Sequence, residues 1–398
     1  MKYDIAIIGS GMSGLMASIY LAEQGIKTAV ISKGDPICSL SSGCIDIAGN
    51  DELTLDSIDK FPQEHPYKKV GNTEIYNSIQ YFRDLMEKQG CYYTGDIRKN
   101  RRILTPLGRT RVTSLVPFSM EYADIKKDET FHIISFKDIK DFFPSYVTGE
   151  FPDTDISIFD AGTYTTMGIA AKMDNTEFLS SFITWINLQN IKQGKIGIPA
   201  VLGITKTFKI IKKLEKETGK FFFEIPTLPP SIPGLRLYRN LKSIAEKKGV
   251  SFYGSSEIID FKKNNDRIIN ITIKKPGRPD QVGADAFILA TGSFVSGGLF
   301  LDKNIFKETV FNLPVFSPKN EELFNQNFFK LGHPIEKAGI LIDNNFKALE
   351  SGYDNLFIAG SILAFSETMK YQCGHGMAIS TGIVAAKNAL KFLGGTLK

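Results

Sequence analysis

The sequence has few cysteines, and they are scattered. Only four occur in 398 residues, at Cys38, Cys44, Cys91 and Cys373. No two of them form a Cys-x-x-Cys pair, so neither a zinc site nor a local iron–sulfur cluster is expected, and we predict no metal ligand set. Four scattered thiols instead indicate a reduced, intracellular chain.

A leader sequence, long apolar runs and a large charge excess are also missing. No apolar stretch reaches the roughly 18 residues that a membrane-spanning helix needs. Asp4 and nearby glycines interrupt the apolar N-terminus and no cleavage site follows, which argues against a signal peptide. The net charge is only +5 and basic residues alternate with acidic ones, so nucleic acid is not an expected ligand.

The first 32 residues have the pattern of a nucleotide-binding unit. Residues 4–8 are short, β-branched and followed by glycine, which predicts a buried parallel strand. Residues 12–24 predict a helix that stops at Gly25, and residues 27–32 predict a second strand. Together these elements form a strand–turn–helix–strand unit of about 30 residues, the size of a mononucleotide-binding half.

The turn in this unit is Gly9-Ser-Gly11-Met12-Ser13-Gly14. The first glycine permits the tight turn, the second lets the backbone approach a pyrophosphate, and the third allows close packing of helix on strand. A phosphate would then accept hydrogen bonds from the free N–H groups at the helix N-terminus. The competing interpretation is a glycine-rich turn that binds nothing.

The second strand ends without the usual acidic residue. An Asp or Glu at this position binds an adenosine ribose, but the chain has Ser32 followed by Lys33. Either the Ser32 hydroxyl or Asp35 contacts the ribose of FAD, or the ligand lacks an adenosine ribose, as FMN does. Sequence drift at a tolerant position is a third interpretation.

Three later segments also place glycine or other small residues at the end of a predicted strand or at the start of a predicted helix. A predicted strand ending in Ala290-Thr-Gly292 and another ending before Gly360 place small residues where the chain passes a nucleotide. A predicted helix from Met377 to Phe392 opens after Gly374-His-Gly376, where its N-terminus suits the flavin O2 end. The cofactor contacts predicted in these segments are Ala290, Thr291, Gly292, Gly360, Gly374, Gly376 and Met377.

In this order, these motifs resemble the two-dinucleotide-binding-domain flavoproteins. The resemblance implies an α/β fold with an FAD/NAD(P)-binding Rossmann-like domain, formed by residues 1–95 plus 240–398. We expect residues 95–240 to form a discontinuous second α+β domain that serves as a substrate, cap or interface domain. Ser41, Ser42 and Gly43 would run past the flavin ring, unless they form a plain surface turn. No histidine adjoins them, which argues against a covalent histidyl–flavin bond.

Four segments are similar to the family of B subunits of anaerobic glycerol-3-phosphate dehydrogenase. They are residues 41–43, the Pro-rich 225–237, the strand end 289–298 and the glycine turn 372–376. The resemblance implies oxidation of sn-glycerol 3-phosphate to dihydroxyacetone phosphate, with electrons passed to a quinone. It also implies FMN in this chain (FAD being the alternative), an FAD-containing sister subunit and an iron–sulfur membrane-anchor subunit. The chain would then be cytoplasmic and peripheral to the inner face of the cell membrane through these partners.

Two other functions remain open from the sequence. One is a stand-alone flavin oxidoreductase for another small anionic substrate. The other is a non-catalytic assembly or electron-transfer subunit that supports a catalytic sister.

Candidate reactive side chains are few. As the base that takes the hydroxyl proton we favour His375, in the glycine turn, and then His333; we interpret His65 as a surface residue and His132 as structural. Arginine suits a substrate phosphate because its planar fork binds two oxygens at once. The phosphate candidates are Arg109, Arg111, Arg236 and Arg239.

Overall fold

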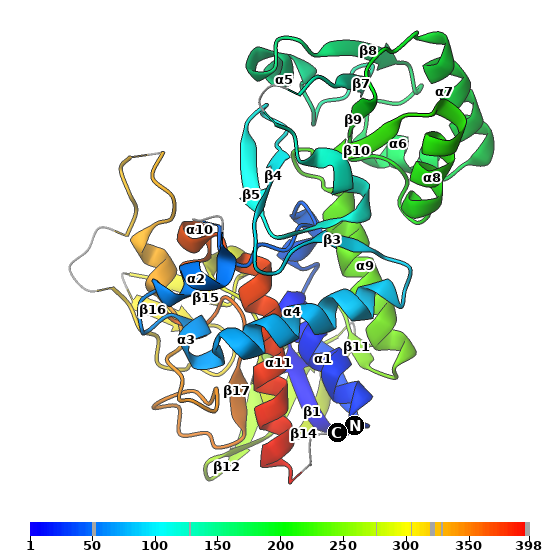
Figure 1. Cartoon of the computed structure of the whole chain (residues 1–398). Helices are drawn as coiled ribbons and strands as arrows, with labels where there is room; N and C mark the ends of the chain where they lie inside the picture. Colours follow the sequence, from blue (N-terminus) through cyan, green and yellow to red (C-terminus); the bar gives the residue numbers. More distant parts are fainter. Residues whose placement is uncertain are drawn as a thin grey trace. The chain divides into compact units, whose positions relative to one another are not determined.

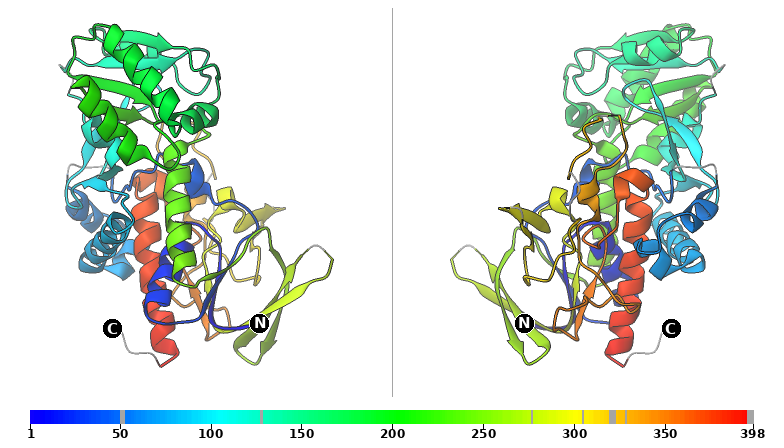
Figure 2. Two further views of the ribbon diagram at one scale, coloured as in Figure 1. Left: turned by 90° about the vertical axis from the view of Figure 1, so that its right-hand side faces the viewer. Right: turned by 90° about the vertical axis from the view of Figure 1, so that its left-hand side faces the viewer.

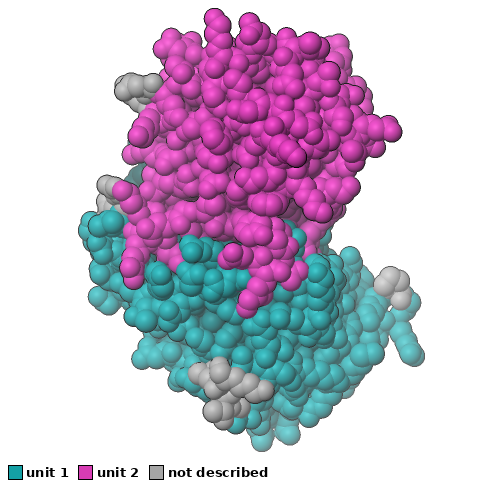
Figure 3. Space-filling view, turned by 45° about the vertical axis from the view of Figure 1, so that its right-hand side comes forward, with its two compact units in different colours: residues 1–37, 46–84, 240–398 teal, residues 38–45, 85–239 magenta. Residues whose placement is uncertain are grey.

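The computed structural model describes residues 1–49, 53–126, 129–275, 277–303, 305–318, 323–327 and 329–394. The chain divides into two compact units, coloured separately in Figure 3. Unit 1 comprises residues 1–37, 46–84 and 240–398, and unit 2 comprises residues 38–45 and 85–239. The sequence places the domain boundaries at 95 and 240, whereas the chain passes between the units at 37/38, 45/46, 84/85 and 239/240.

Unit 1 is built on a mostly parallel sheet (Figure 1). Its parallel strands lie in the order β11, β2, β1, β14, β17. Their bounds are β1 Lys2–Ile8, β2 Thr28–Ile31, β11 Ser251–Tyr253, β14 Asp280–Leu289 and β17 Leu356–Ile358. Side chains of β1 and β2 are buried on both faces, which explains why these strands appear as continuous apolar runs.

An antiparallel hairpin extends this sheet. β12 (Glu257–Asn264) pairs with β13 (Arg267–Lys274), and β13 pairs with the first residues of β14. The turn between the two strands lies at Asn265 and Asp266, residue types that are common in turns. Figure 2 shows it projecting from the rest of unit 1.

Two helices from opposite ends of the chain pack together in unit 1. α1 (Met12–Glu23) lies against α11 (Gly374–Phe392), and a Cβ on Gly382 would stand 2.4 Å from the Ser13 carbonyl oxygen. Glycine therefore permits the close approach of the two helices. The remaining elements of unit 1 are α2 Thr54–Asp59, α3 Pro66–Val70, α10 Thr368–Tyr371, the hairpin of β15 Leu299–Asp302 and β16 Ile305–Glu308, and the short 3₁₀ helices Phe294–Ser296 and Pro334–Lys337. Three helices pass from one unit to the other: the 3₁₀ helix Ile37–Leu40, α4 (Asn72–Glu87) and α9 (Ile232–Lys247).

Unit 2 has its own sheet of four strands, ordered β8, β7, β9, β10. All neighbouring pairs within this sheet are parallel, and antiparallel hairpins lie beside it in the same unit. The strands are β7 His132–Phe136, β8 Asp155–Phe159, β9 Lys195–Pro199 and β10 Phe221–Ile225. Around them lie α5 Pro144–Glu150, α6 Thr166–Met173, α7 Thr176–Leu188, α8 Thr207–Thr218, the hairpin pairs β3 Tyr93–Gly95 with β6 Leu115–Pro117 and β4 Arg101–Leu104 with β5 Thr110–Thr113, and the 3₁₀ helix Phe118–Ala123.

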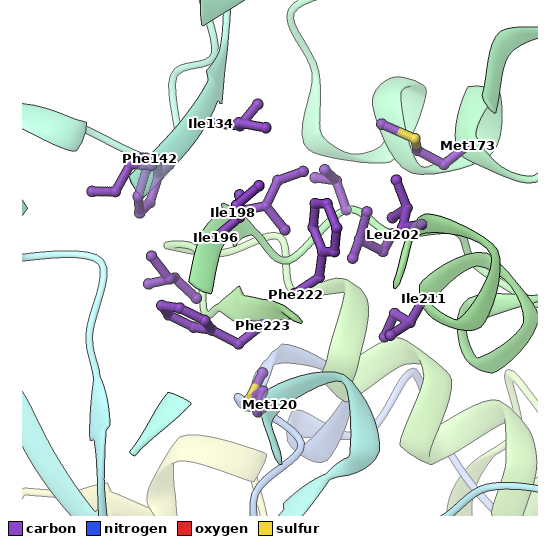
Figure 4. Packing of buried hydrophobic residues seen from close by; sticks show 14 of the residues in the cluster. Met120, Ile134, Phe142, Met173, Ile196, Ile198, Leu202, Ile211, Phe222 and Phe223 are labelled. Atoms are coloured by element: carbon purple, nitrogen blue, oxygen red, sulfur yellow. The ribbon is translucent and has the colours of Figure 1, made fainter. Parts of the chain in front are cut away.

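The core of unit 2 lies on the faces of this sheet (Figure 4). Phe222 and Phe223 point to opposite faces of β10 and are both buried, while Phe221 at its start is exposed. Ile196 and Ile198 of β9 join the same cluster. Each buried aliphatic or aromatic side chain of this size contributes about 1.5–3 kcal/mol, so this cluster is the main stabilising feature of unit 2.

α11 begins at Gly374, three residues before the Met377 start that the sequence predicts. In unit 2, α8 begins at Thr207, because the N–H groups of the three preceding residues bond to the Asp174 carboxylate. α9 begins at Ile232, inside the Pro-rich segment. Pro233 stands in its first turn, where a proline removes no helical hydrogen bond.

Candidate functional site

The glycine turn connects β1 with α1 and touches the end of β14. Gly9 has a φ of +114°, and a Cβ there would stand 2.2 Å from the carbonyl oxygen of Ala290. A Cβ on Gly14 would stand 2.0 Å from the carbonyl oxygen of Gly9. Both positions exclude any side chain, so the ends of two parallel strands and the first turn of α1 come into backbone contact.

Gly11 differs from its neighbours because it faces open space. A Cβ built there has no described protein atom within 4 Å, and its φ of −69° suits any residue. Gly11 is the N-cap of α1, whose start lacks a capping side chain and an acidic residue within the part of the chain that is described. The first N–H groups of a helix have no acceptor within it and carry positive partial charge. This end of α1 therefore suits an anionic ligand.

Two hydroxyl groups beside the turn support the same conclusion. Ser10 Oγ and Thr291 Oγ1 are buried, and neither has a hydrogen-bond partner among the described residues. A buried hydroxyl without a partner costs roughly 1–3 kcal/mol. Ser10 directly follows Gly9 in the chain and Thr291 directly follows Ala290, and Gly9 and Ala290 are the two residues in backbone contact. Unsatisfied donors around an open glycine are what a bound nucleotide phosphate requires, so the site fits such a group.

The end of β17 completes this side of the site. Gly360 has a φ of +81°, and a Cβ there would meet Ser13 Oγ at 2.4 Å. Its N–H donates to Thr381 Oγ1 of α11 at 3.0 Å. The carboxyl ends of β1, β14 and β17 thus converge on the start of α1, where ligands of open α/β sheets bind. The structure brings together Gly9, Gly11, Ser13, Gly14, Ala290, Thr291 and Gly360 from the predicted set, while Met12 is the first residue of α1 and Gly292 follows Thr291 with a φ of +79°.

A carboxylate from another strand lies beside the residues that follow β2. The Ser32 N–H donates to the Tyr253 carbonyl oxygen, and the Ser32 carbonyl oxygen accepts from Ser256 N–H. These bonds bring the start of β12 alongside, where Glu257 Oε1 lies 2.7 Å from Lys33 Nζ. The hydrogen bond from Lys33 holds the pKa of Glu257 below its ordinary value. No local pattern in the sequence points to this pair, because more than 220 residues separate its members.

The start of α11 is packed tightly from behind. The Gly376 N–H donates to the Asp46 carbonyl oxygen at 3.0 Å, and a Cβ on Gly376 would stand 2.6 Å from the hydroxyl oxygen of Tyr67. Gly374, by contrast, would place a Cβ with no described atom within 4 Å of it, and Met377 is fully buried. His375 lies between the two glycines, half-buried in the first turn of the helix.

His65 lies in the buried layer behind this turn. Our interpretation of it as a surface residue is wrong, because its side chain is fully buried. Nδ1 accepts from the Tyr67 N–H at 3.2 Å, and Nε2 lies 3.8 Å from Cys373 Sγ. Rings of Phe61 and Tyr371 enclose the imidazole. Pro66, at the first position of α3, makes His65 its N-cap, and this His-Pro pair is the sequence signal that we missed.

Burial sets the protonation of this layer. It lowers the pKa of His65 to about 3 and raises the pKa of the Cys373 thiol well above its ordinary value. Near neutral pH the pair is therefore a neutral imidazole beside a neutral thiol, and not a thiolate–imidazolium pair. Cys373 directly precedes Gly374, so this buried pair holds the start of α11 in place.

The other predicted site residues lie elsewhere. His333 is exposed, precedes the 3₁₀ helix Pro334–Lys337, and its Nδ1 accepts from the Asn325 N–H at 3.0 Å. Ser41, Ser42 and Gly43 belong to unit 2.

The four arginine candidates have different surroundings. Arg236 is largely buried: it pairs with the Glu224 carboxylate at 2.6 Å and donates to the Gly203 carbonyl oxygen through Nε at 2.8 Å. Exposed Arg109 pairs with Glu150 at 2.8 Å, and Arg239 is exposed on α9. Arg111 is half-buried and donates through Nη2 to Ser42 Oγ at 3.0 Å. Arg111 thus contacts another residue that the sequence singles out.

Neither a metal cluster nor a membrane span is found in the described ranges. Within them, His, Cys, Asp and Glu side chains form no group of three or more that could hold a metal ion. Nor do these ranges contain a helix with the length and apolarity needed to cross a bilayer.

Comparison with known proteins gives three findings. The family described as FAD binding domain matches residues 4–134 and 183–377. The B subunit of anaerobic glycerol-3-phosphate dehydrogenase from Actinobacillus pleuropneumoniae serotype 5b is 26% identical over 436 residues, covering 100% of both chains, and the protein of that name in Aliivibrio fischeri is 28% identical over 440 residues, covering 99% of this chain and 96% of the relative. Among solved structures, 3-ketosteroid delta1-dehydrogenase from Sterolibacterium denitrificans aligns with a TM-score of 0.45 at 10% identity, covering 98% of this chain and 99% of the other.

Proposed function

Since the chain belongs to the FAD binding domain family, we propose that it is the flavoprotein subunit of an anaerobic glycerol-3-phosphate dehydrogenase. The reaction would oxidise sn-glycerol 3-phosphate to dihydroxyacetone phosphate. The observation that carries the flavin is the open Gly11 beside the unpartnered hydroxyls of Ser10 and Thr291, within the described ranges. The substrate comes from the name of relatives that match over their full length.

The cofactor in this proposal is FAD. The resemblance implies FMN, and the missing acid at the end of β2 leaves both FMN and FAD open, but the family is an FAD-binding one. Glu257, beside Lys33, supports FAD because it supplies a carboxylate next to Ser32, where a ribose hydroxyl needs an acceptor. Ser32 and Glu257 would then contact the adenosine ribose, and the N-terminus of α1 would hold the pyrophosphate.

The chain's own residues would bind and orient the reactants. The flavin, when bound, supplies the acceptor for a hydride equivalent. His375 is our proposed base for the substrate hydroxyl, because it stands between two glycines at the start of α11. His333 is a weaker proposal, since its Nδ1 accepts a hydrogen bond from the Asn325 N–H, which leaves the proton of the neutral imidazole on Nε2. The buried layer of His65 and Cys373 would fix the start of α11.

The partners and the location are part of the proposal. The relatives are named as one subunit of a dehydrogenase, which supports a complex of several subunits. Electrons would leave through an FAD-containing sister subunit and an iron–sulfur anchor subunit to a quinone. Through them, the chain would be held at the inner face of the cell membrane.

One purified sample tests most of this. We expect the isolated full-length chain to show a flavin absorption band, and the extracted cofactor to have the mass of FAD. Adding sn-glycerol 3-phosphate without oxygen should bleach the band. Absence of flavin would overturn the flavoenzyme, the mass of FMN would overturn FAD, and a band that bleaches only when the sister subunit is present would indicate an assembly or electron-transfer subunit.

A further inference from the structure

The strand β8 ends the unit 2 sheet on one side (Figure 1). It pairs with β7, and no other strand in the described ranges lies along its second edge. The Phe159 carbonyl oxygen accepts from the Lys137 N–H at 2.9 Å, directly after β7, so Phe159 directs its peptide groups toward β7. These directions alternate along a strand, so Ile156 and Ile158 direct their N–H and C=O groups outward. Within the described part of the chain, these outward groups have no partner.

The same two residues carry exposed apolar side chains. Ile156 is 38% exposed and Ile158 is 59% exposed. Because side chains alternate along a strand, both lie on one face of the sheet. Phe159 points to the other face, where its ring centroid lies 5.1 Å from that of Trp185. The edge of β8 therefore combines outward backbone groups with an exposed pair of isoleucines.

The edge strand of the unit 1 sheet is built differently. β12 has register shifts in its pairing with β13, and it carries the exposed side chains of Lys262 and Lys263. Bulges and lysines are devices that keep an edge strand from pairing with another chain. β8 instead pairs with β7 in an unbroken register and contains no Lys, Pro or Gly, and its single charged residue is Asp155, at its start. The β8 edge is therefore suited to accept a further strand.

We propose that β8 pairs with β8 of a second copy of this chain, antiparallel and about a two-fold axis at Ser157. In this register Ile156 forms a hydrogen-bonded pair with Ile158 of the second copy, and the reverse, so every outward N–H and C=O of both strands is used. The isoleucines of the two copies then lie side by side on one face. Because the same patch complements itself under a two-fold axis, a second copy fits this edge better than an unrelated strand.

The charges near β8 are compatible with this register. Asp155 would stand opposite Phe159 of the second copy, so no carboxylate of one strand directly opposes a carboxylate of the other. Asp155 Oδ2 accepts from Gln193 Nε2 at 2.9 Å, and Asp160, just after β8, pairs with Lys137 at 3.0 Å. The interface involves unit 2 alone and is independent of flavin and substrate.

The first test is sedimentation of the full-length chain at concentrations from about 1 to 100 µM, the range of a small interface. We expect the average mass to rise from that of one chain toward that of two. Ile158→Lys places an ammonium group of each copy in the apolar patch and should raise the dissociation constant by about tenfold to a hundredfold. The matched control is Ile259→Lys, because Ile259 is 50% exposed on the edge strand β12. The control should change the constant by less than about twofold.

The second test is a cysteine at the centre of the register. The two copies of Ser157 would form a non-hydrogen-bonded pair, whose Cα atoms lie about 4.5 Å apart, within the reach of a disulfide. Ser157→Cys should therefore give a covalent dimer on mild oxidation with diamide. Ile158→Cys should give no more dimer than the unsubstituted chain, because the residue opposite it is Ile156 and not a second cysteine.

Each other outcome decides against the pairing. A chain that sediments as a monomer at every concentration would overturn it, as would equal weakening by Ile158→Lys and Ile259→Lys or stronger cross-linking through Ile158→Cys than through Ser157→Cys. If the chain is monomeric and Ile158→Lys instead abolishes binding to the sister subunit, the edge binds an unlike chain and self-pairing is wrong. Trp185 fluorescence, from α7 of unit 2, reports whether each variant is folded. Should Ile158→Lys not fold, cross-linking through Ser157→Cys decides. A dimer without flavin would overturn the proposed function and leave the pairing intact.

Discussion

Both units contain parallel strands, but they differ in whether the hydrogen-bond donors at the strand ends have partners within the chain. In unit 1 the turn after β1 leaves Gly11 open and Ser10 without a hydrogen-bond partner in the described ranges. In unit 2 the turn after β9 is closed by the chain itself: the Asp174 carboxylate accepts from Ile204 N–H at 2.9 Å, Thr205 N–H at 3.1 Å and Lys206 N–H at 3.1 Å.

A second carboxylate closes the same turn. Glu224 of β10, with its side chain fully buried, accepts from the Leu202 N–H at 2.7 Å and pairs with Arg236. Side-chain carboxylates thus occupy the backbone donors that a nucleotide phosphate would occupy in unit 1. The difference teaches that a parallel α/β sheet alone does not make a nucleotide site; the satisfaction of the donors at its strand ends decides.

The largest effect should come from opening the closed turn of unit 2. Arg236→Ala leaves the buried Glu224 carboxylate without its charge partner, and breaking such a pair costs about 3–5 kcal/mol. The chain has one tryptophan, Trp185 in α7, so its fluorescence during urea unfolding reports on unit 2 alone. Arg239→Ala, on the exposed side of α9, is the control. A midpoint shift no larger than that of the control would contradict the structural role of the ion pair.

The next effect should come from filling the open turn of unit 1. In Gly11→Val the new side chain meets no described protein atom near its Cβ, so the fold should persist while the ligand's phosphate is blocked. We expect flavin affinity to fall by about a hundredfold, close to 3 kcal/mol. The measurement is the ratio of flavin to protein after gel filtration. Gly14→Ala, whose Cβ would lie 2.0 Å from the Gly9 carbonyl oxygen, should in contrast also lower the stability of unit 1.

Lowering the pH should destabilise unit 1 through the protonation of His65. The unfolded chain takes up a proton near pH 6.5 and the folded chain only near 3, so this contribution to stability is complete above 6.5 and is lost as the pH falls toward 3. Between pH 7 and pH 4.5 the loss amounts to about 2.5 kcal/mol. Flavin release, as a reporter of unit 1, should follow it, and His65→Phe should flatten the dependence. An unchanged slope in that variant would assign the acid sensitivity to other groups.

The smallest effect should come from weakening the internal anion of unit 2. Asp174→Asn keeps one acceptor oxygen and removes the charge, so we expect a loss of about 1–2 kcal/mol, read from Trp185 fluorescence. Added phosphate should recover none of it if the closed turn has no room for an external anion. Recovery by phosphate would mean that the two units differ less than we infer.

The sequence predicts the local parts of this comparison well. The glycine turn at 9–14 and the strand at 356–358 are confirmed because both depend on neighbours in the chain, such as a β-branched run next to glycine. The sequence does not predict the contacts between residues that are far apart in the chain. Glu257 reaches the end of β2, His65 reaches Cys373, and Asp174 reaches Lys206 only through the fold. No local pattern announces such contacts, because each residue alone is an ordinary polar side chain of a loop or helix end.

The pairing of β1 has a consequence for biosynthesis. Lys2 pairs with Gly283, and the nucleotide turn also needs β17 and α11, which come last in the chain. The ribosome delivers every strand of the unit 2 sheet by Ile225, so this unit can close while β1 is paired with β2 on one edge and still lacks β14 on the other. Cofactor loading therefore has to follow the synthesis of β14, β17 and the start of α11. Termination before β14 would leave a folded unit 2 attached to β1 with one open, apolar edge, which is prone to aggregation and is not a partly active enzyme.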